Sequence, residues 1–225
     1  MYIGIYDAIR GCRIQELRLK TIANNLANTG TGGFKRDITS FDKALRVHMK
    51  TDFNQGNVRR TDNRLDLALE GEGFFKVKTP AGIRYTRNGR FCLNAEGRLV
   101  TQNGDPVLGA GGPITIRGEH VAIDAAGQIE VDGAAVDTLS MASFERPELL
   151  QKEGLSYYVY NGDEKEILRP KEISVRDGFL EESNVVIAEE VIRMVETLRI
   201  FESYQKVLQS FDESDAKAIN QVGRL

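Results

Sequence analysis

The first segment of the chain shows apolar positions at helical spacing. Apolar or small side chains recur there in alternating steps of three and four residues, at Tyr2, Ile5, Ile9, Cys12, Leu19, Ala23 and Leu26. This spacing is typical of a seam between paired helices, and Glu16 is its one polar break. Ile14 and Ile22 widen the apolar stripe. The glycines that begin at Gly30 predict the end of this helix.

The last segment repeats the pattern. Its apolar stripe follows the same three-four spacing, at Ile187, Val191, Met194, Leu198, Phe201 and Leu208. Gln205 interrupts the stripe, and charged residues fill the other faces. Ser183 or Asn184 can cap the start of this helix with a side-chain oxygen. The segment therefore predicts a second long helix.

The middle of the chain, residues 61–178, follows a strand pattern. Apolar and polar residues alternate from Leu65 to Glu70, and turn residues recur at short intervals. Asn88-Gly89 and Asn103-Gly104 are dipeptides of tight hairpins, whose two central residues need positive φ, and Asp132-Gly133 predicts another turn. The middle therefore predicts an antiparallel, all-β domain.

Together these patterns predict an α+β fold. We expect an N-terminal helix in residues 1–30, a linker in residues 31–60, the β domain in residues 61–178 and a C-terminal helix in residues 182–225. Each helix alone is marginal in water, so the two are expected to pair as a coiled-coil-like helical domain. A helical layer docked on the sheet is the open alternative. A two-helix pair still exposes apolar surface, which further copies or partners would bury.

Composition narrows the possible functions. The formal net charge is −3, which provides no long-range attraction to nucleic acid or to an anionic membrane. No apolar run approaches the roughly 20 residues of a membrane span. The two cysteines and two histidines match no zinc motif, so neither a metal nor a cofactor is expected. The first residues lack the features of a cleaved signal peptide, which favours either a cytoplasmic protein or export without such a signal.

Three local motifs resemble features of catalytic or ligand-binding sites. Gly71-Glu72-Gly73 lacks the third glycine and the following helix of a phosphate-binding loop. The carboxylate pairs Glu181-Glu182 and Glu189-Glu190 lie on or beside a predicted helix, where a solvated face explains them. The tyrosine-rich segment Tyr157–Tyr160 could bind carbohydrate or cover a sheet, and the second is commoner. The chain is therefore predicted not to be an enzyme and to bind no small-molecule substrate.

Four separated motifs carry a resemblance to a known family. They are Ala23–Thr29 with Gly33–Arg36, Leu65–Phe75 with Tyr85–Gly89, Gly178–Val185, and Glu196–Lys206. In this order they resemble the bacterial flagellar basal-body rod protein family, within the flagellar axial rod and hook proteins. The match runs over essentially the whole chain. Because the chain is short, it is more similar to rod subunits than to hook proteins.

The resemblance implies a structural role. Asn63–Leu69 and Gly104–Gly109 are more similar to proximal rod members of the family than to distal ones, and the distal rod is the alternative. Such a subunit would leave the cell unfolded through the flagellar type III export apparatus. It would then polymerise helically with copies of itself and neighbouring rod subunits in the cell envelope. The resulting drive shaft would transmit torque from motor to hook.

The predicted assembly interface combines the two apolar stripes with asparagines and an anchor. Asparagine is rare in helices, so its density between residues 24 and 28 favours contacts across helices. The interface residues are Tyr2, Ile5, Ile9, Leu19, Ile22, Asn24, Asn25, Leu26, Asn28, Phe34, Asn184, Ile187, Val191, Met194, Leu198, Phe201 and Leu208. Two other classes stay open: a β-sheet module that binds cell-wall sugar or protein through helical anchors, and a hydrolase.

Overall fold

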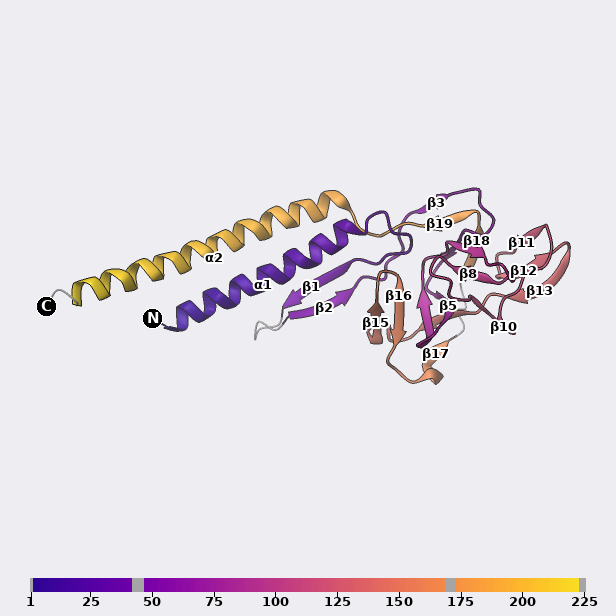
Figure 1. Ribbon diagram of the computed structural model, residues 1–225, viewed down its shortest axis with the longest axis horizontal. Helices are drawn as coiled ribbons and strands as arrows, with labels where there is room; N and C mark the ends of the chain where they lie inside the picture. The colour runs from indigo at the N-terminus through magenta and orange to yellow at the C-terminus, as the bar shows by residue number, and fades with distance from the viewer. Residues whose placement is uncertain (1, 42–46, 169–172, 223–225) are drawn as a thin grey trace. The chain divides into compact units, whose positions relative to one another are not determined.

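The computed structural model describes residues 2–41, 47–168 and 173–222, and the chain divides into two compact units. A helical unit comprises residues 1–27, 37–50 and 186–225, and a β unit comprises residues 28–36 and 51–185. The prediction of an α+β fold with paired terminal helices and a largely antiparallel β body is confirmed (Figure 1).

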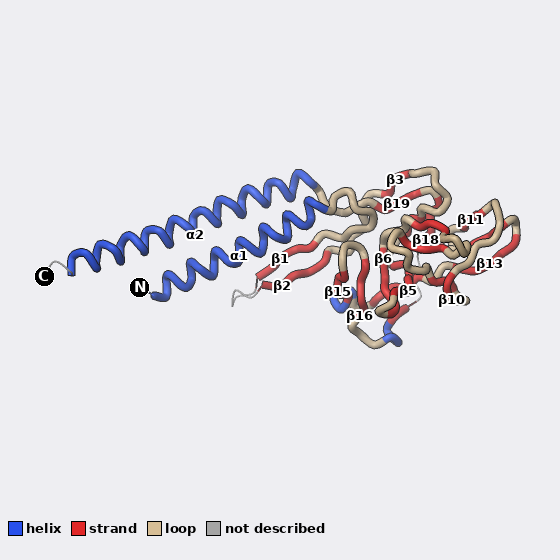
Figure 2. Tube along the Cα trace, viewed as in Figure 1, coloured by secondary structure: helices blue, strands red, loops and turns tan. Residues whose placement is uncertain are grey.

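The helical unit contains two long helices and a pair of strands. Helix α1 spans Tyr2–Ala27 and helix α2 spans Ile187–Val222. Strands β1 (Asp37–Phe41) and β2 (Val47–Thr51) pair with each other, and β1 packs on α1 (Figure 2). Residues 31–60, expected as a linker, therefore contain regular structure. Helix α2 begins five residues later than expected.

The β unit consists of short strands. They are β3 Val58–Arg60, β4 Leu67–Glu70, β5 Phe74–Thr79, β6 Gly82–Thr86, β7 Phe91–Leu93, β8 Leu99–Thr101, β9 Leu108–Gly109, β10 Gly112–Pro113, β11 Val121–Ile123, β12 Gln128–Val131, β13 Ala134–Thr138, β14 Met141–Phe144, β15 Leu150–Glu153, β16 Tyr157–Tyr160, β17 Ile167–Leu168, β18 Ser174–Asp177 and β19 Phe179–Glu181. Two short 3₁₀ turns, Pro147–Leu149 and Glu164–Glu166, connect some of them.

One six-stranded antiparallel sheet, in the order β15-β16-β6-β5-β14-β17, forms the centre of the β unit. Smaller sheets surround it. In two of them a strand from late in the sequence returns to an early one, since β18 pairs with β4 and β19 pairs with β3. These pairings bring the ends of the β segment together.

Two clusters of apolar side chains fill the β unit. The larger includes Phe75, whose ring meets that of Phe91 edge to face at 5.1 Å between centroids. The smaller is aromatic and gathers Phe74, Phe144 and Tyr158. Burying large apolar side chains is the dominant favourable contribution to folding, so this unit has a core of its own.

The turn predictions had mixed outcomes. Asp132 and Gly133 have φ of 51° and 84°, the left-handed conformations of a tight hairpin turn, and they join β12 to β13. Asn88-Gly89 instead connects β6 to β7, which lie in different sheets, so the hairpin predicted there is wrong. Gly89 is required for space, because an added Cβ would lie 1.7 Å from the carbonyl oxygen of Leu67.

Candidate assembly surface

Helices α1 and α2 pair antiparallel in a register set by two glycines. A Cβ added to Gly11 would lie 2.4 Å from the Tyr204 ring, and one added to Gly4 would lie 3.1 Å from the Phe211 ring. A step of seven residues forward along α1 thus matches a step of seven back along α2. Seven residues are about two helical turns, so the same faces meet at each repeat.

The register continues into a polar contact at the other end of the pair. Asn25 donates from Nδ2 to the carboxylate of Glu190 at 3.2 Å, and Glu190 is only 1% exposed. Arg193 also donates to Glu190, at 3.0 Å. The Asn25 amide further pairs with the backbone of Asp37 in β1, through an Nδ2···O distance of 2.9 Å and an N···Oδ1 distance of 3.0 Å. One asparagine therefore joins both helices to β1.

The two helix faces that meet differ: the α1 face is built largely from small and polar residues, and the α2 face carries large apolar and aromatic ones. The buried residues of α1 are Ala8, Gly11, Ile14, Gln15, Thr21, Ile22 and Asn25. The least exposed positions of α2 alternate in steps of four and three, at Glu190, Met194, Thr197, Phe201, Tyr204, Leu208 and Phe211. Most residues of the apolar stripe expected on α1 lie one position away from the residues of α1 that are buried. Small side chains on α1 make room for the aromatic rings of α2, which apolar spacing alone does not reveal.

Several predicted interface residues consequently lie outside the pair. Ile9 is 50% exposed, and Ile187, Val191 and Leu198 are 57%, 46% and 41% exposed. They do not join α1 to α2 within one chain, contrary to the seam that the sequence predicted. The cause is the choice of helix faces: the glycine contacts fix which face of each helix meets the other, and these four side chains then point toward solvent. Their role in contacts between subunits stays a prediction.

The other predicted residues are distributed over both units. Ile22 and Asn25 are buried in the helical unit, and Asn28 and Phe34 are buried in the β unit. Asn24 is exposed. The side chain of Tyr2 lies outside the described residues. Partly buried positions are Ile5, Leu19, Leu26, Met194, Phe201, Leu208 and Asn184.

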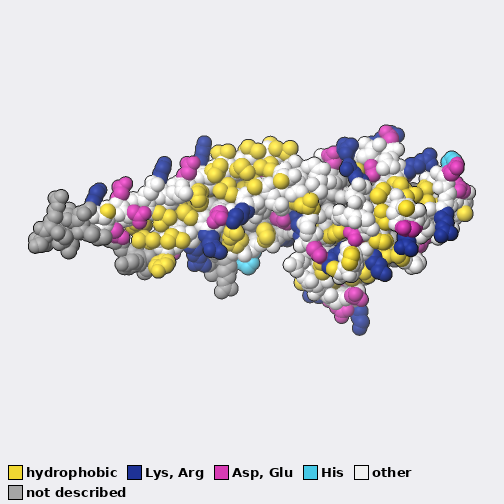
Figure 3. Space-filling model, viewed as in Figure 1, with side chains coloured by type: hydrophobic (Ala, Val, Ile, Leu, Met, Phe, Trp, Pro, Cys, Tyr) yellow, Lys and Arg dark blue, Asp and Glu magenta, His cyan; other side chains and the backbone are white. Residues whose placement is uncertain are grey.

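The two helices together expose a set of large apolar side chains, which we call the candidate assembly surface. Figure 3 shows apolar side chains gathered along the helices. The set comprises Tyr6, Ile9 and Leu17 on α1 and Ile187, Val191, Ile192, Val195, Leu198, Ile200 and Val207 on α2. Large exposed apolar side chains that share a helix face, as Ile187, Val191, Val195 and Leu198 do on α2, are a feature of interaction sites.

Asn184, a predicted cap of the second helix, has a different role. Its Oδ1 accepts from the backbone N–H of Arg36 at 2.8 Å, and its Nδ2 donates to the carbonyls of Asp52 and Asn54 at 2.8 and 3.0 Å. It therefore ties three chain segments of the β unit together. Helix α2 begins at Ile187, too far along the chain for Asn184 to cap it.

A buried ion cluster in the β unit was missed by the sequence analysis. Lys35 and Arg87 contact the same carboxylate, Glu181, at 2.5 and 3.1 Å, and all three side chains are almost fully buried. Burial lowers the pKa of Lys35 and of Arg87, although the Glu181 charge acts in the opposite direction. Lys35 also donates to the Asn54 carbonyl at 2.7 Å. Nothing in the local sequence distinguishes these charges from solvated ones.

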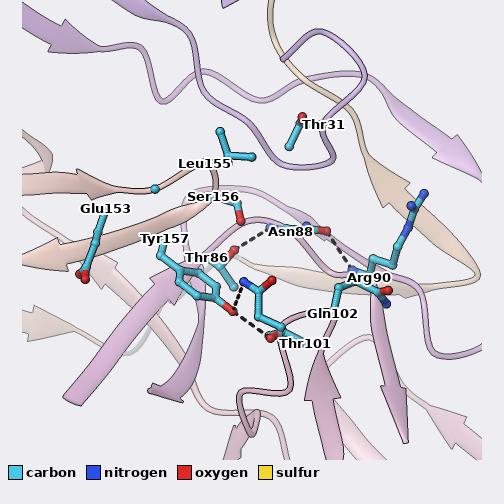
Figure 4. A pocket seen from close by; sticks show the side chains of 12 residues that line it. Thr31, Thr86, Asn88, Arg90, Thr101, Gln102, Glu153, Leu155, Ser156 and Tyr157 are labelled. Carbon is cyan, nitrogen blue, oxygen red and sulfur yellow. Dashed lines mark hydrogen bonds between the residues drawn. The ribbon is translucent and has the colours of Figure 1, made fainter. Parts of the chain in front are cut away.

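A polar hollow in the β unit lies between the loops that follow β6, β8 and β15 (Figure 4). The Tyr157 hydroxyl there donates to the Asp105 carboxylate at 2.7 Å and lies 2.8 Å from the Thr101 hydroxyl. Burial and the Asp105 bond raise the pKa of Tyr157. Tyr158 is fully buried in the aromatic cluster. The tyrosine-rich segment is strand β16 of the central sheet, where Tyr158 packs in the aromatic cluster and Tyr157 contacts the neighbouring loops.

Among the described residues, no helix combines the length and the apolar character that crossing a membrane requires.

Comparison with known proteins places the chain among flagellar proteins. Residues 68–131 match the family described as the flagellar hook protein FlgE/F/G D1 domain, and residues 176–221 match the C-terminal part of flagellar basal-body rod FlgEFG proteins. The chain is 31% identical to the flagellar basal-body rod protein FlgF of Rhizobium meliloti, over 99% of each chain. It is 31% identical to FlgF of Caulobacter vibrioides over 92% of each chain. It is 28% identical to FlgG of Buchnera aphidicola, and that match covers 95% of this chain and 97% of the relative.

Proposed function

Because the chain belongs to the family of flagellar basal-body rod proteins, we propose that it polymerises through its terminal helices into the rod. It is a structural subunit of the basal-body rod, and its similarity to FlgF relatives favours the proximal part of the rod. The family is one of structural proteins and assembles with other basal-body components. Copies of this chain and neighbouring rod subunits are the partners proposed for the helices.

The observation that carries the proposal is the candidate assembly surface. Ile187, Val191 and Leu198 share one face of α2, because steps of four and seven residues return to nearly the same direction on a helix. All three are exposed although the chain has its own apolar core elsewhere. Burying one such side chain is worth about 1.5–3 kcal/mol, so a repeated contact can hold a shaft of many subunits.

The alternating spacing of the least exposed positions on α2 supports a coiled-coil-like pair. The fully buried residues of the helix pair are mostly small or polar, the larger side chains of α2 are only partly buried, and isolated helices are marginal in water. A unit of this kind gains order when neighbours cover it. The same marginal stability suits passage through the flagellar type III export apparatus in an unfolded state, followed by folding at the growing rod of the basal body.

The proposal is tested by Leu198→Asp. The side chain is exposed in the single subunit, so the thermal midpoint of the monomer should change little. A carboxylate buried at a subunit contact has no compensating partner there, so polymerisation should be lost. Sedimentation of the concentrated full-length chain measures polymer, and swimming of a complemented deletion strain measures function.

Ser203→Asp is the matched control, because it places the same charge on a different face of α2, at an exposed position. Polymerisation of the Ser203→Asp chain should resemble that of the unmodified chain. Normal polymer from the Leu198→Asp chain would contradict the proposed use of this face.

A further inference from the structure

Three Asn-Gly dipeptides occur in the chain, and they begin at Asn88, Asn103 and Asn161. An asparagine that precedes a glycine loses its side-chain amide readily, because the glycine has no Cβ to hinder its backbone nitrogen. That nitrogen can attack the side-chain carbonyl carbon of the asparagine once the two atoms come together, which requires the backbone to rotate. The fold places the three dipeptides in different surroundings.

The first dipeptide is enclosed by the β unit. The Asn88 Oδ1 accepts from the backbone N–H of Arg90 at 3.1 Å, so its side chain is held in place. The Gly89 carbonyl accepts from the backbone N–H of Leu67 at 2.9 Å, and a Cβ added to Gly89 would lie 1.7 Å from the Leu67 carbonyl oxygen. The backbone here cannot rotate unless β4 moves, so the folded chain protects Asn88.

The third dipeptide is exposed but anchored. Asn161 donates from its backbone N–H to the Leu149 carbonyl and from Nδ2 to Gln151 Oε1, both at 3.1 Å. Its glycine lies against an aromatic ring, because a Cβ added to Gly162 would be 2.5 Å from the Tyr160 ring. Rotation at this dipeptide therefore disrupts two hydrogen bonds and a ring contact.

The second dipeptide lies at the open tip of the turn that follows β8. Asn103 and Gly104 are exposed, and a Cβ added to Gly104 would meet no atom of the described residues within 4 Å. The Asn103 Nδ2 lies 3.4 Å from the Tyr157 hydroxyl, which is long for a hydrogen bond. The Gly104 N–H donates to the Thr101 carbonyl at 2.9 Å. A turn whose tip is free of packing opens at a small cost in free energy, and opening releases the Gly104 nitrogen.

We propose that Asn103 is a site of spontaneous deamidation in the folded chain, with the Gly104 nitrogen as the nucleophile. Hydroxide takes the proton of that nitrogen, which then bonds to the side-chain carbonyl carbon of Asn103. The bond from this carbon to Nδ2 breaks, and Nδ2 takes a proton from water and leaves as ammonia, so that hydroxide is regenerated. A second water opens the five-membered ring at either carbonyl carbon and leaves aspartate or isoaspartate. The reaction goes beyond the proposed function, because it needs neither a partner subunit nor an enzyme.

Either product changes the wall of the polar hollow in Figure 4, which Asn103 lines. The Tyr157 hydroxyl loses a donor and gains a second carboxylate near its partner Asp105. Isoaspartate also adds one atom to the main chain of the turn, whose ends are tied by the hydrogen bond from the Thr101 N–H to the Asp105 carbonyl at 2.9 Å. Deamidation should therefore weaken the hydrogen bonds that hold this turn.

Peptide mass spectrometry of the folded, full-length chain at mildly alkaline pH tests the proposal. Conversion of the amide to an acid raises the mass of the peptide that contains it, and fragment ions distinguish isoaspartate from aspartate. We expect Asn103 to convert at least roughly tenfold faster than Asn88, with Asn161 between them, because the three backbones differ in the free energy of local opening.

The same chain unfolded in guanidinium chloride is the matched control. Asn103 and Asn161 both begin the tripeptide Asn-Gly-Asp, so they should convert at similar rates once the fold is lost. Asn103→Gln should remove the mass change from its peptide, because glutamine would have to form a larger ring. Conversion of Asn88 or Asn161 as fast as that of Asn103 in the folded chain would overturn the inference, and so would a mass change that persists in the Asn103→Gln peptide.

Discussion

In the β unit the side chains that meet in the interior are mainly large and apolar, whereas in the helical unit most of them are small or polar. Phe75 and Leu67 are fully buried in the first, and Gly11, Gln15 and Glu190 are buried in the second. Many large apolar side chains of the helices, such as Ile9, Val191 and Leu198, instead face solvent. The difference indicates that the β unit completes its core within one chain, while the helical unit leaves apolar area for neighbours.

The largest expected effect comes from Glu181→Gln, which breaks the β unit. Lys35 and Arg87 would stay buried without a counter-charge, and removing one partner of a buried pair costs about 3–5 kcal/mol. Urea unfolding measures the loss. Glu182→Gln is the control, because its partial exposure beside Arg59 limits the effect to about 0–1 kcal/mol. Equal losses in the two variants would contradict a structural role for the cluster.

A smaller effect is expected in the helical unit from Gly11→Ala. The added methyl would overlap the Tyr204 ring, and overpacking of this kind typically costs about 1–3 kcal/mol. The helical circular-dichroism signal should melt earlier while the β unit keeps its midpoint. Tyr204→Ala in the same chain should restore part of the loss. At Gly30 an added Cβ meets no atom within 4 Å, so Gly30→Ala should leave the helical melt unchanged.

The pH dependence of the free energy of unfolding of the β unit should reflect the lowered pKa of Lys35. Burial lowers its pKa in the folded chain below the ordinary value of 10.5, so between the two values the unfolded chain holds more protons. The contribution of Lys35 to the free energy of unfolding should therefore rise with pH in that window. Urea unfolding of the unmodified chain and of Lys35→Met, from neutral pH upward, isolates this slope. If the free energy of unfolding of the unmodified chain, relative to that of Lys35→Met, fell as the pH rose, the result would contradict the prediction.

Hydrogen exchange sharpens the comparison without any substitution. Amides of α1 and α2 in the monomer should exchange faster than those of β5 and β6, because few large side chains cover the helices. Polymerisation should slow exchange in the helices more than in the strands. Equal protection of both units in a monodisperse monomer would contradict the view that the helices await partners.

Much of the fold was predictable because its signals are local. The glycines from Gly30 onward end α1, alternation from Leu65 marks the first strands, and Asp132-Gly133 forms the predicted turn. Strands β1 and β2 were missed. Their residues are largely polar and exposed where described, so little apolar patterning marks them.

The site was less predictable because its members depend on distant partners. Gly11 matters only because Tyr204 lies opposite it, and Lys35 is buried only because Glu181 returns to it from 146 positions later in the chain. Asn184 is likewise used for three backbone contacts in the β unit that no capping pattern implies.

By itself the sequence determined that long helices end the chain, that strands fill its middle and that it belongs with flagellar rod proteins. Periodicity, turn residues and short motifs are properties of neighbouring residues, so they can be read along the chain. Only the tertiary structure decided which face of each helix is covered. Successive residues on a helix point about 100° apart, so an apolar stripe and a stripe of small residues one position away predict different partners. Because the aromatic rings on α2 are large, α1 packs against them with its stripe of small residues, and Ile9, Val191 and Leu198 face outward.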